Sequence, residues 1–218
     1  MPIPGSVEGA GRGRILAPLE GAAAALRDTP FEDFAGRSRC SAAEGLGGCC
    51  CGGPCSEETA PVLLLAIGNP LMADDGAGQE ILSRLESDSK RWGHDVELVD
   101  GGTQGLALLG KFEKRKAVVF LDAVRLGYKA GAVHVLNGKD ILELGCRPSN
   151  SAHEGSAPEI LRALQLLGET PAEVTLIGIE PERIETGMGL SSTVRNSLGL
   201  AAGFARMTIN RLLSNGDE

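Results

Sequence analysis

Two adjacent carboxylates, Asp74 and Asp75, follow an apolar run and lead into a glycine-rich segment. The apolar run, residues 62–67, is typical of a buried strand, and residues 68–70 (Gly-Asn-Pro) then turn the chain. In open α/β folds such turns lie at the carboxyl edge of a parallel sheet, where ligands bind. A phosphate site would use bare backbone N–H groups and a lysine there, whereas two carboxylates repel phosphate. The pair therefore indicates a cation site or a site for metal-assisted hydrolysis.

Two further strand-like runs also end on an aspartate. Asp100 closes the run that begins at Val96, and Asp122 closes the run that begins at Ala117. The ends of parallel strands share one edge of a doubly wound sheet, so we expect these carboxylates to converge on Asp75. A carboxylate that closes a buried run costs desolvation free energy unless it meets a cation or several donors. The alternative is that each aspartate only caps the helix or turn that follows it.

The three histidines have different surroundings. His94 lies in a polar stretch and is predicted to be at the surface, whereas His134 is predicted to be a partly buried strand residue. His153 lies in a polar loop just before a helix start, which is the best position for completing a site. With Asp75 and Asp122 it makes a set of two carboxylates and one imidazole. Such a set suits Zn, Mn, Fe or Ni and leaves positions open for water or substrate.

The turn Asp100–Thr103 is a second candidate binding element. It contains the glycine pair Gly101 and Gly102, and paired glycines let the backbone approach a ligand closely. The alternative is a strand-to-helix turn that needs positive φ, with Thr103 as the helix N-cap. The chain has no G-x-S-x-G nucleophile elbow.

The elements that must position these residues alternate along the chain. The helix after Ser156 has a serine N-cap, Pro158 in its first turn and Glu159 as the capping-box acid. This order predicts an α/β fold with a mostly parallel twisted sheet and helices on both faces. The predicted strands are Val62–Ile67, Val96–Asp100, Ala117–Asp122, Ala132–Leu136 (an edge strand) and Glu173–Ile179. The predicted helices are Gly76–Ser89, Thr103–Phe112, Ser156 to a C′ glycine at Gly168, and a last helix from Ser191 or Ser192 to about Leu212.

The 218 residues allow one domain, 61–218, and an extension, 1–60, which is rich in Gly, Ala, Ser and Pro and is predicted to be disordered. The extension holds five of the six cysteines: Cys40, Cys49, Cys50, Cys51 and Cys55. A metal-binding or redox tail is one interpretation, and an oxidation-prone flexible segment is the alternative. Structural zinc sites prefer two separated cysteine pairs, which the extension lacks. The sixth, Cys146, has only His153 nearby as a partner for a Cys–His dyad, an arrangement that we do not favour.

Charge and hydropathy exclude several classes of function. The formal net charge of −8 argues against nucleic acid, which is bound through clustered Lys and Arg. No apolar run reaches the roughly 18 residues of a membrane-spanning helix, and the first residues lack the apolar region of a secretory signal. We therefore expect a cytoplasmic monomer with no membrane insertion.

Together these residues resemble the nickel–iron hydrogenase maturation endopeptidases. The resemblance covers roughly residues 62–213 and rests on blocks that occur in order at suitable spacing. The blocks are Gly68-Asn69-Pro70-Leu71-Met72-Ala73-Asp74-Asp75-Gly76-Ala77-Gly78, Asp100-Gly101-Gly102-Thr103, Leu121-Asp122-Ala123, Ser151-Ala152-His153, and Gly178-Ile179-Glu180-Pro181 followed by Gly189-Leu190-Ser191. The cysteine-rich extension is outside this pattern.

The resemblance implies a five-stranded sheet between helices, a phosphorylase/hydrolase-like three-layer sandwich. It also implies an aspartic-type endopeptidase that removes the C-terminal extension of a hydrogenase large-subunit precursor after nickel insertion. The metal ligands would be Asp75, Asp122 and His153, with both aspartates also catalytic and Asp100–Thr103 holding the substrate. Some members have Glu as the first ligand, so Asp75 is an acceptable variant with a shorter reach. Nickel would arrive with the substrate, and cadmium or zinc would take its place in the isolated protein.

Two competing interpretations use the same residues. One is an assembly module that checks for nickel through the three ligands but cuts nothing. The other is a divalent-metal hydrolase with a metal of its own, which would contain stoichiometric metal when purified without substrate.

Overall fold

The computed structural model describes residues 59–144 and 155–214. Within them lies a five-stranded sheet with the strand order β2-β1-β3-β5-β4. Strands β1 (Val62–Ile67), β2 (Val96–Gly102), β3 (Ala117–Ala123) and β5 (Glu173–Ile179) run parallel, and β4 (Val133–Asn137) runs antiparallel to β5. The predicted α/β class, the mostly parallel sheet and the edge position of the fourth strand are confirmed.

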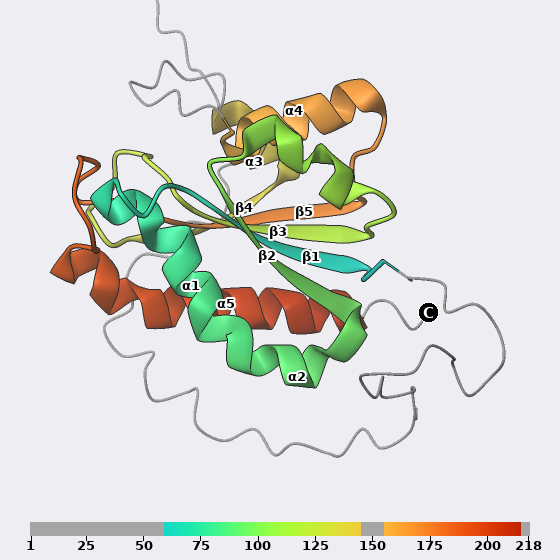
Figure 1. The fold of residues 1–218 in the computed structure, drawn as a ribbon, viewed down its shortest axis with the longest axis horizontal. Coiled ribbons are helices and arrows are strands. Elements are labelled where there is room, and N and C mark those ends of the chain that lie inside the picture. The colour runs from blue at the N-terminus through green and yellow to red at the C-terminus, as the bar shows by residue number, and fades with distance from the viewer. Residues whose placement is uncertain (1–58, 145–154, 215–218) are drawn as a thin grey trace, which may run out of the picture. The chain divides into compact units, whose positions relative to one another are not determined.

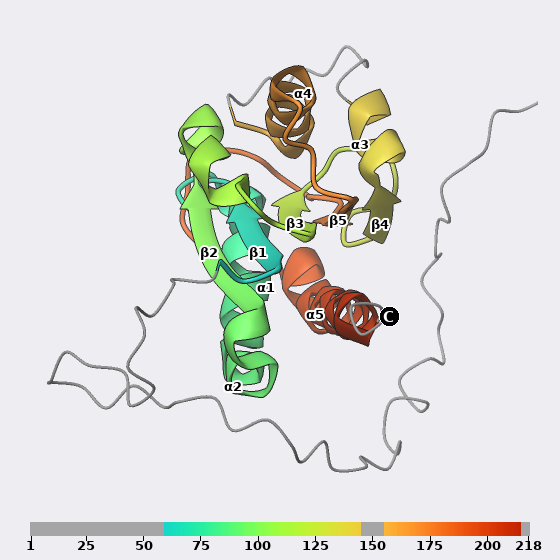
Figure 2. The same ribbon diagram turned by 90° about the vertical axis from the view of Figure 1, so that its right-hand side faces the viewer.

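Helices cover both faces of the sheet, as Figures 1 and 2 show. One face carries α1 (Ala77–Leu85), α2 (Ser89–Trp92) and the long α5 (Ser192–Ser214). The other face carries α3 (Gly138–Leu144), α4 (Ala157–Leu167) and the 3₁₀ helix Gly105–Phe112. Short 3₁₀ helices also form at Ala73–Gly76, Glu86–Asp88 and Gly93–Asp95.

Alternate residues of each strand enter two separate cores, because successive strand side chains point to opposite faces. Leu64 and Val119 pack toward α1 and α5, whereas Leu65 and Phe120 pack toward α3 and α4. The central strands β1 and β3 have no exposed residue. This explains why the two strands appear in the sequence as continuous apolar runs rather than alternating ones.

The helix after Ser156 differs in detail from the predicted capping box. Ser156 occupies the N-cap but its side chain makes no cap hydrogen bond. The Glu159 carboxylate instead accepts a hydrogen bond from the N–H of Gly155, at 2.6 Å, one residue before the N-cap. The helix ends at Gly168 with φ +73°, as predicted for a C′ glycine.

The remaining boundaries differ modestly from those predicted. The predicted helix 76–89 is an α-helix only as far as Leu85 and continues as a 3₁₀ turn. No helix is predicted over Gly138–Leu144, where the structure forms α3 directly after the edge strand. Within the two described ranges no helix has the length and apolarity to cross a membrane.

Candidate active site

The first candidate carboxylate, Asp75, is positioned by the turn after β1. Its Oδ2 accepts a hydrogen bond from the N–H of Asn69 at 2.9 Å. Gly68 has φ +131°, and a Cβ built there would lie 2.0 Å from the carbonyl oxygen of Asp75. Only glycine allows so close an approach, so the turn folds directly back onto Asp75. The side-chain amide of Gln79 closes the turn by donating to the Gly68 carbonyl at 2.9 Å.

Helix α1 begins directly over the ends of β1 and β3. A Cβ on Gly78 would lie 2.4 Å from the carbonyl oxygen of Leu121 and 2.5 Å from that of Ile67. The glycine therefore allows the first turn of α1 to pack against the backbone of both strands. This close packing brings Asp75, just before α1, to the edge where Asp122 closes β3.

Asp75 and Asp122 are both buried, with 5% and 8% of their surfaces exposed. Burial raises the pKa of Asp122 well above its usual range, and the negative charge of Asp75 raises it further. A hydrogen bond from the N–H of Ala123 to Asp122 Oδ1, at 2.7 Å, opposes the shift. Asp75 and Asp122 thus lie near enough for the charge of one to affect the other, whereas Asp100, the third carboxylate expected there, is exposed and hydrogen-bonded to Gly102. Two buried carboxylates this near one another favour a shared cation or a shared proton.

Asp74, the neighbour of Asp75, has a different role. It is fully buried, and its carboxylate accepts hydrogen bonds from the N–H groups of Ser191, Glu182 and Arg183 at 2.6, 2.9 and 3.0 Å. Burial raises the pKa of Asp74, but these hydrogen bonds outweigh it and bring the pKa below the usual range. Backbone donors therefore use both oxygens, and Asp74 fastens the segment before α5 to the turn that carries Asp75.

The segment Asp100–Thr103 turns later than predicted, because β2 continues through Gly102 and only Thr103 lies in the turn. Asp100 is exposed, and its Oδ1 accepts a hydrogen bond from the N–H of Gly102 at 3.0 Å. A Cβ on Gly101 would lie 2.8 Å from the side chain of Leu108, and Gly102 has φ +49°. The positive φ is as expected, but Thr103 is not the N-cap, because the following 3₁₀ helix has Gln104 there. Substrate binding by this turn stays a prediction.

The described histidines take no part in a metal cluster. His94 is exposed, as predicted. His134 is buried more completely than predicted, with 2% of its surface exposed. His153 lies outside the described residues, as do Cys146 and the cysteines of the extension. In residues 59–144 and 155–214, no group of three or more His, Cys, Asp or Glu side chains is arranged to hold a metal ion. The ligand set Asp75, Asp122 and His153 therefore stays a prediction.

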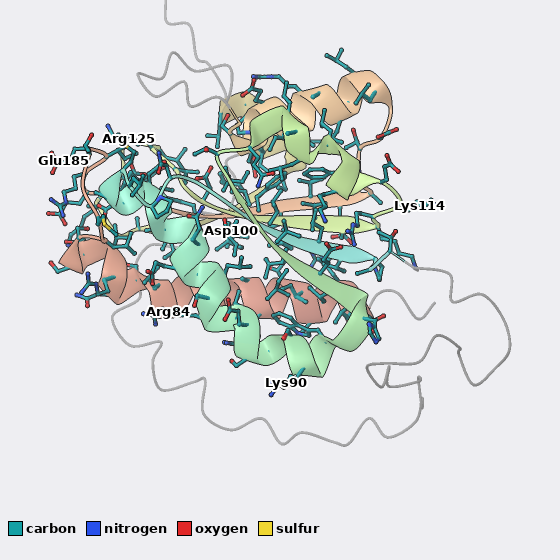
Figure 3. All side chains as sticks on the ribbon, viewed as in Figure 1. Arg84, Lys90, Asp100, Lys114, Arg125 and Glu185 are labelled. Atoms are coloured by element: carbon teal, nitrogen blue, oxygen red, sulfur yellow. The ribbon has the colours of Figure 1, made fainter. Side chains whose placement is uncertain are left out.

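A further buried acid at this end of the molecule, Glu180, is absent from the predicted site. It follows β5 directly and is only 5% exposed. The pattern that identified Asp100 and Asp122, an acid that closes an apolar run, also applies to it. Figure 3 shows Arg125, in the loop after β3, and Glu185, in the segment after β5, at the same end of the sheet, with Lys114 at the other end.

Comparisons with known proteins show which family the chain resembles. A family model described as hydrogenase maturation protease matches residues 80–205. The hydrogenase 2 maturation protease of Escherichia coli K12 is 34% identical over 134 residues, which cover 61% of this chain and 80% of that protein. The hydrogenase expression/formation protein HupD of Rhodobacter capsulatus is 35% identical over 124 residues. That match covers 57% of this chain and 59% of HupD, less than two thirds of its length.

Solved structures give the same result. The hydrogenase maturating endopeptidase HybD from E. coli superposes with a TM-score of 0.61 at 29% identity, covering 71% of this chain and 93% of that one. The [NiFe] hydrogenase maturation protease HybD from Thermococcus kodakarensis superposes with a TM-score of 0.55, also at 29% identity, covering 67% and 97%. Since the family model alone matches more than half of the chain, this chain belongs to the hydrogenase maturation protease family.

Proposed function

We propose that this protein is an endopeptidase that removes the C-terminal extension of a nickel–iron hydrogenase large-subunit precursor after nickel has been inserted. Family membership supports the protease activity and the type of substrate. One observation carries the proposal for the site. Asp75 and Asp122, from different elements, are buried together at the carboxyl edge of the sheet, and the charge of one raises the pKa of the other.

The donor chemistry fits a divalent metal. Two carboxylates, joined by the imidazole of His153, make an oxygen and nitrogen set that suits nickel. We take the nickel to be bound in the substrate. These three side chains would then contact it only when the precursor already contains nickel. A bound metal would polarise a nearby water or peptide carbonyl.

The chain's own groups have the following roles in the proposed cleavage. A water attacks the carbonyl carbon of the scissile peptide, the C–N bond breaks, and the leaving amine takes up a proton. Asp75 and Asp122 are placed to polarise the attacking water and to hold the proton between these steps. Asn69 orients Asp75 through its backbone N–H. The segment Asp100–Thr103, in which Asp100 and Thr103 are exposed, would hold the extended substrate segment.

The proposal is tested by single substitutions in a processing assay with nickel-loaded precursor. Asp75→Asn, Asp122→Asn and His153→Ala should each lower the rate by about 100-fold or more, since acid–base groups contribute factors of that size. The exposed residues Asp95 and His94 provide matched controls, Asp95→Asn and His94→Ala, which should process at the wild-type rate. Normal processing by the Asp75 and His153 variants would rule out these roles.

A further inference from the structure

The carboxylate of Glu180 is held by a loop rather than by a charge. Its Oε1 accepts hydrogen bonds from the N–H groups of Leu126 and Gly127 at 3.1 and 3.0 Å, and its Oε2 lies 3.0 Å from the Leu126 nitrogen. The Nε2 atom of His134 lies 3.5 Å from Glu180 Oε2 without a hydrogen bond. Burial lowers the pKa of His134, although Glu180 offsets part of that effect. Backbone N–H groups of the loop therefore provide the recorded hydrogen bonds to the Glu180 carboxylate.

The backbone of Glu180 holds the other end of the same loop. Its N–H donates to the Ala132 carbonyl at 2.8 Å, and its carbonyl accepts from the N–H of Gly131 at 2.8 Å. At the near end, Val124 donates to the carbonyl of Ile179 at 2.9 Å. The segment 124–132, here called the 124–132 loop, is thus fastened at both ends to the residue pair that closes β5.

This loop leaves β3 immediately after Asp122. The Asp122 carboxylate accepts a hydrogen bond from the N–H of Ala123, and the direction of that N–H depends on the path of the chain from Val124 onward. The backbone of Ile179 holds the start of this path at Val124, and the Glu180 carboxylate holds its next residues, Leu126 and Gly127. Asp122 itself pairs with Gly178, two positions before Glu180.

We propose that Glu180 is a positioning residue, which fixes the orientation of Asp122 through the 124–132 loop. Only the expected effect on cleavage rests on the proposed function; the structural coupling of Glu180 to Asp122 does not. A hydrogen-bond acceptor at Glu180 is what the loop requires, and a negative charge is not.

Three substitutions separate these requirements. Glu180→Gln keeps a carbonyl oxygen at the Oε1 position, which accepts from both Leu126 and Gly127, and loses only the second acceptor of the Leu126 N–H, at Oε2. Glu180→Met keeps most of the volume and removes the acceptor. Asp88→Ala is the matched control. Asp88 is a buried acid that accepts hydrogen bonds from Arg206 beyond the far end of α1.

The first measurement uses the full chain without substrate and follows backbone amides by NMR. In Glu180→Met the amides of Leu126 and Gly127 should exchange faster and the Ala123 amide resonance should shift, because the loop relaxes. Glu180→Gln should leave the Gly127 and Ala123 amides as in the wild type, and Asp88→Ala should leave all three amides unchanged. An unmoved Ala123 resonance in Glu180→Met would overturn the proposal, even if the wild type cleaved no precursor.

The second measurement is steady-state processing of loaded precursor. Displacing a catalytic group by about 1 Å can cost about 100-fold. Glu180→Met should therefore lose about that factor in kcat with KM nearly unchanged. Glu180→Gln should restore kcat, and Asp88→Ala should keep it despite its lower stability.

Two results would overturn the catalytic part of the proposal. One is a rise in KM alone in Glu180→Met, which would make the loop a substrate-binding element. The other is an equal loss in Glu180→Gln and Glu180→Met, which would assign the effect to the charge. If Glu180→Met does not fold, Glu180→Asp takes its place. The shorter side chain keeps the charge but withdraws the acceptor from the N–H groups of Leu126 and Gly127. Failure of the wild type itself to cleave would instead refute the proposed function.

Discussion

Asp74 and Asp75 show how two adjacent, chemically identical side chains acquire different roles. Asp74 points into the protein, where three backbone N–H groups before α5 donate to it. Asp75 lies at the edge of the sheet, where its negative charge raises the pKa of Asp122. Both residues lie in one 3₁₀ turn, and this tight turn sends their side chains in different directions. The distinction was not predictable, because the donors to Asp74 come from a segment more than 100 residues later.

Asp74→Asn should destabilise the fold. The asparagine amide group would replace one acceptor oxygen with a donor that faces backbone N–H groups. Leaving such buried donors unsatisfied costs about 2 kcal/mol in the free energy of unfolding. Urea denaturation near neutral pH measures this, with the exposed Asp95→Asn as the control, which should change stability by less than about 0.5 kcal/mol. Equal stability of the two variants would contradict the role assigned to Asp74.

His134 should make stability depend on pH in mildly acidic solution. Its pKa in the folded protein is lowered, by burial above all. On acidification the unfolded chain therefore takes up this proton before the folded protein does. The stability that the neutral His134 provides is therefore present in full above the pKa of His134 in the unfolded chain, and it is lost as the pH falls toward the lower pKa of the folded state.

His134→Phe removes this proton uptake and keeps an aromatic ring beside Tyr128, whose ring centroid lies 5.2 Å from that of His134. Between about pH 7.5 and about pH 5 the wild type should lose more free energy of unfolding than the variant. Urea titrations at several pH values measure the difference. Parallel pH profiles for the two proteins would show that His134 is not the group responsible.

At the scale of elements, the close approach of α1 to the sheet is the contact that assembles the site. Gly78 allows this contact because it has no Cβ to collide with the carbonyl oxygens of Leu121 and Ile67. Gly199, in the middle of α5, is exposed, and a Cβ at that position would meet nothing within 4 Å. The two helical glycines therefore differ in what a methyl group would meet.

Alanine at these two positions should have opposite effects. Gly78→Ala should destabilise by about 2 kcal/mol or more, since backbone atoms cannot move aside as flexible side chains do. Gly199→Ala should stabilise by about 0.5 to 1 kcal/mol through helix propensity. Thermal or urea unfolding of both variants measures this. A stabilising Gly78→Ala would contradict the close packing of α1 on β1 and β3.

The elements themselves were largely predictable. Continuous apolar runs give the central strands, and the Ala77, Ile81 and Leu85 stripe of α1 is fully buried, as the helical periodicity predicts. The helix Gly138–Leu144 was missed although Asn137, whose Oδ1 accepts hydrogen bonds from the N–H groups of Lys139 and Asp140, provides a cap signal. The Ser156 capping box was only half right because Glu159 reaches the earlier N–H of Gly155. Such a choice between neighbouring donors depends on local packing rather than on residue type.

At the scale of the whole molecule, topology determines which residues meet. Parallel strands in the order β2-β1-β3-β5 end at one edge. Acids at or near the ends of β2, β3 and β5 are therefore brought to the same edge as the pair after β1. The convergence of Asp75 and Asp122 was predictable from that rule alone. The loop-holding role of Glu180 was not, because its partners, Leu126 and Gly127, carry no sequence signal for receiving a carboxylate.

The central claim is that the protein cuts only a precursor that carries nickel. The most direct measurement is the intact mass of a hydrogenase large-subunit precursor, with and without nickel, after incubation with this protein. We predict the loss of a C-terminal peptide from the nickel-loaded form alone. An unchanged mass in both forms, while a related active protease cleaves the loaded precursor, would contradict the claim, and so would equal cleavage of both forms.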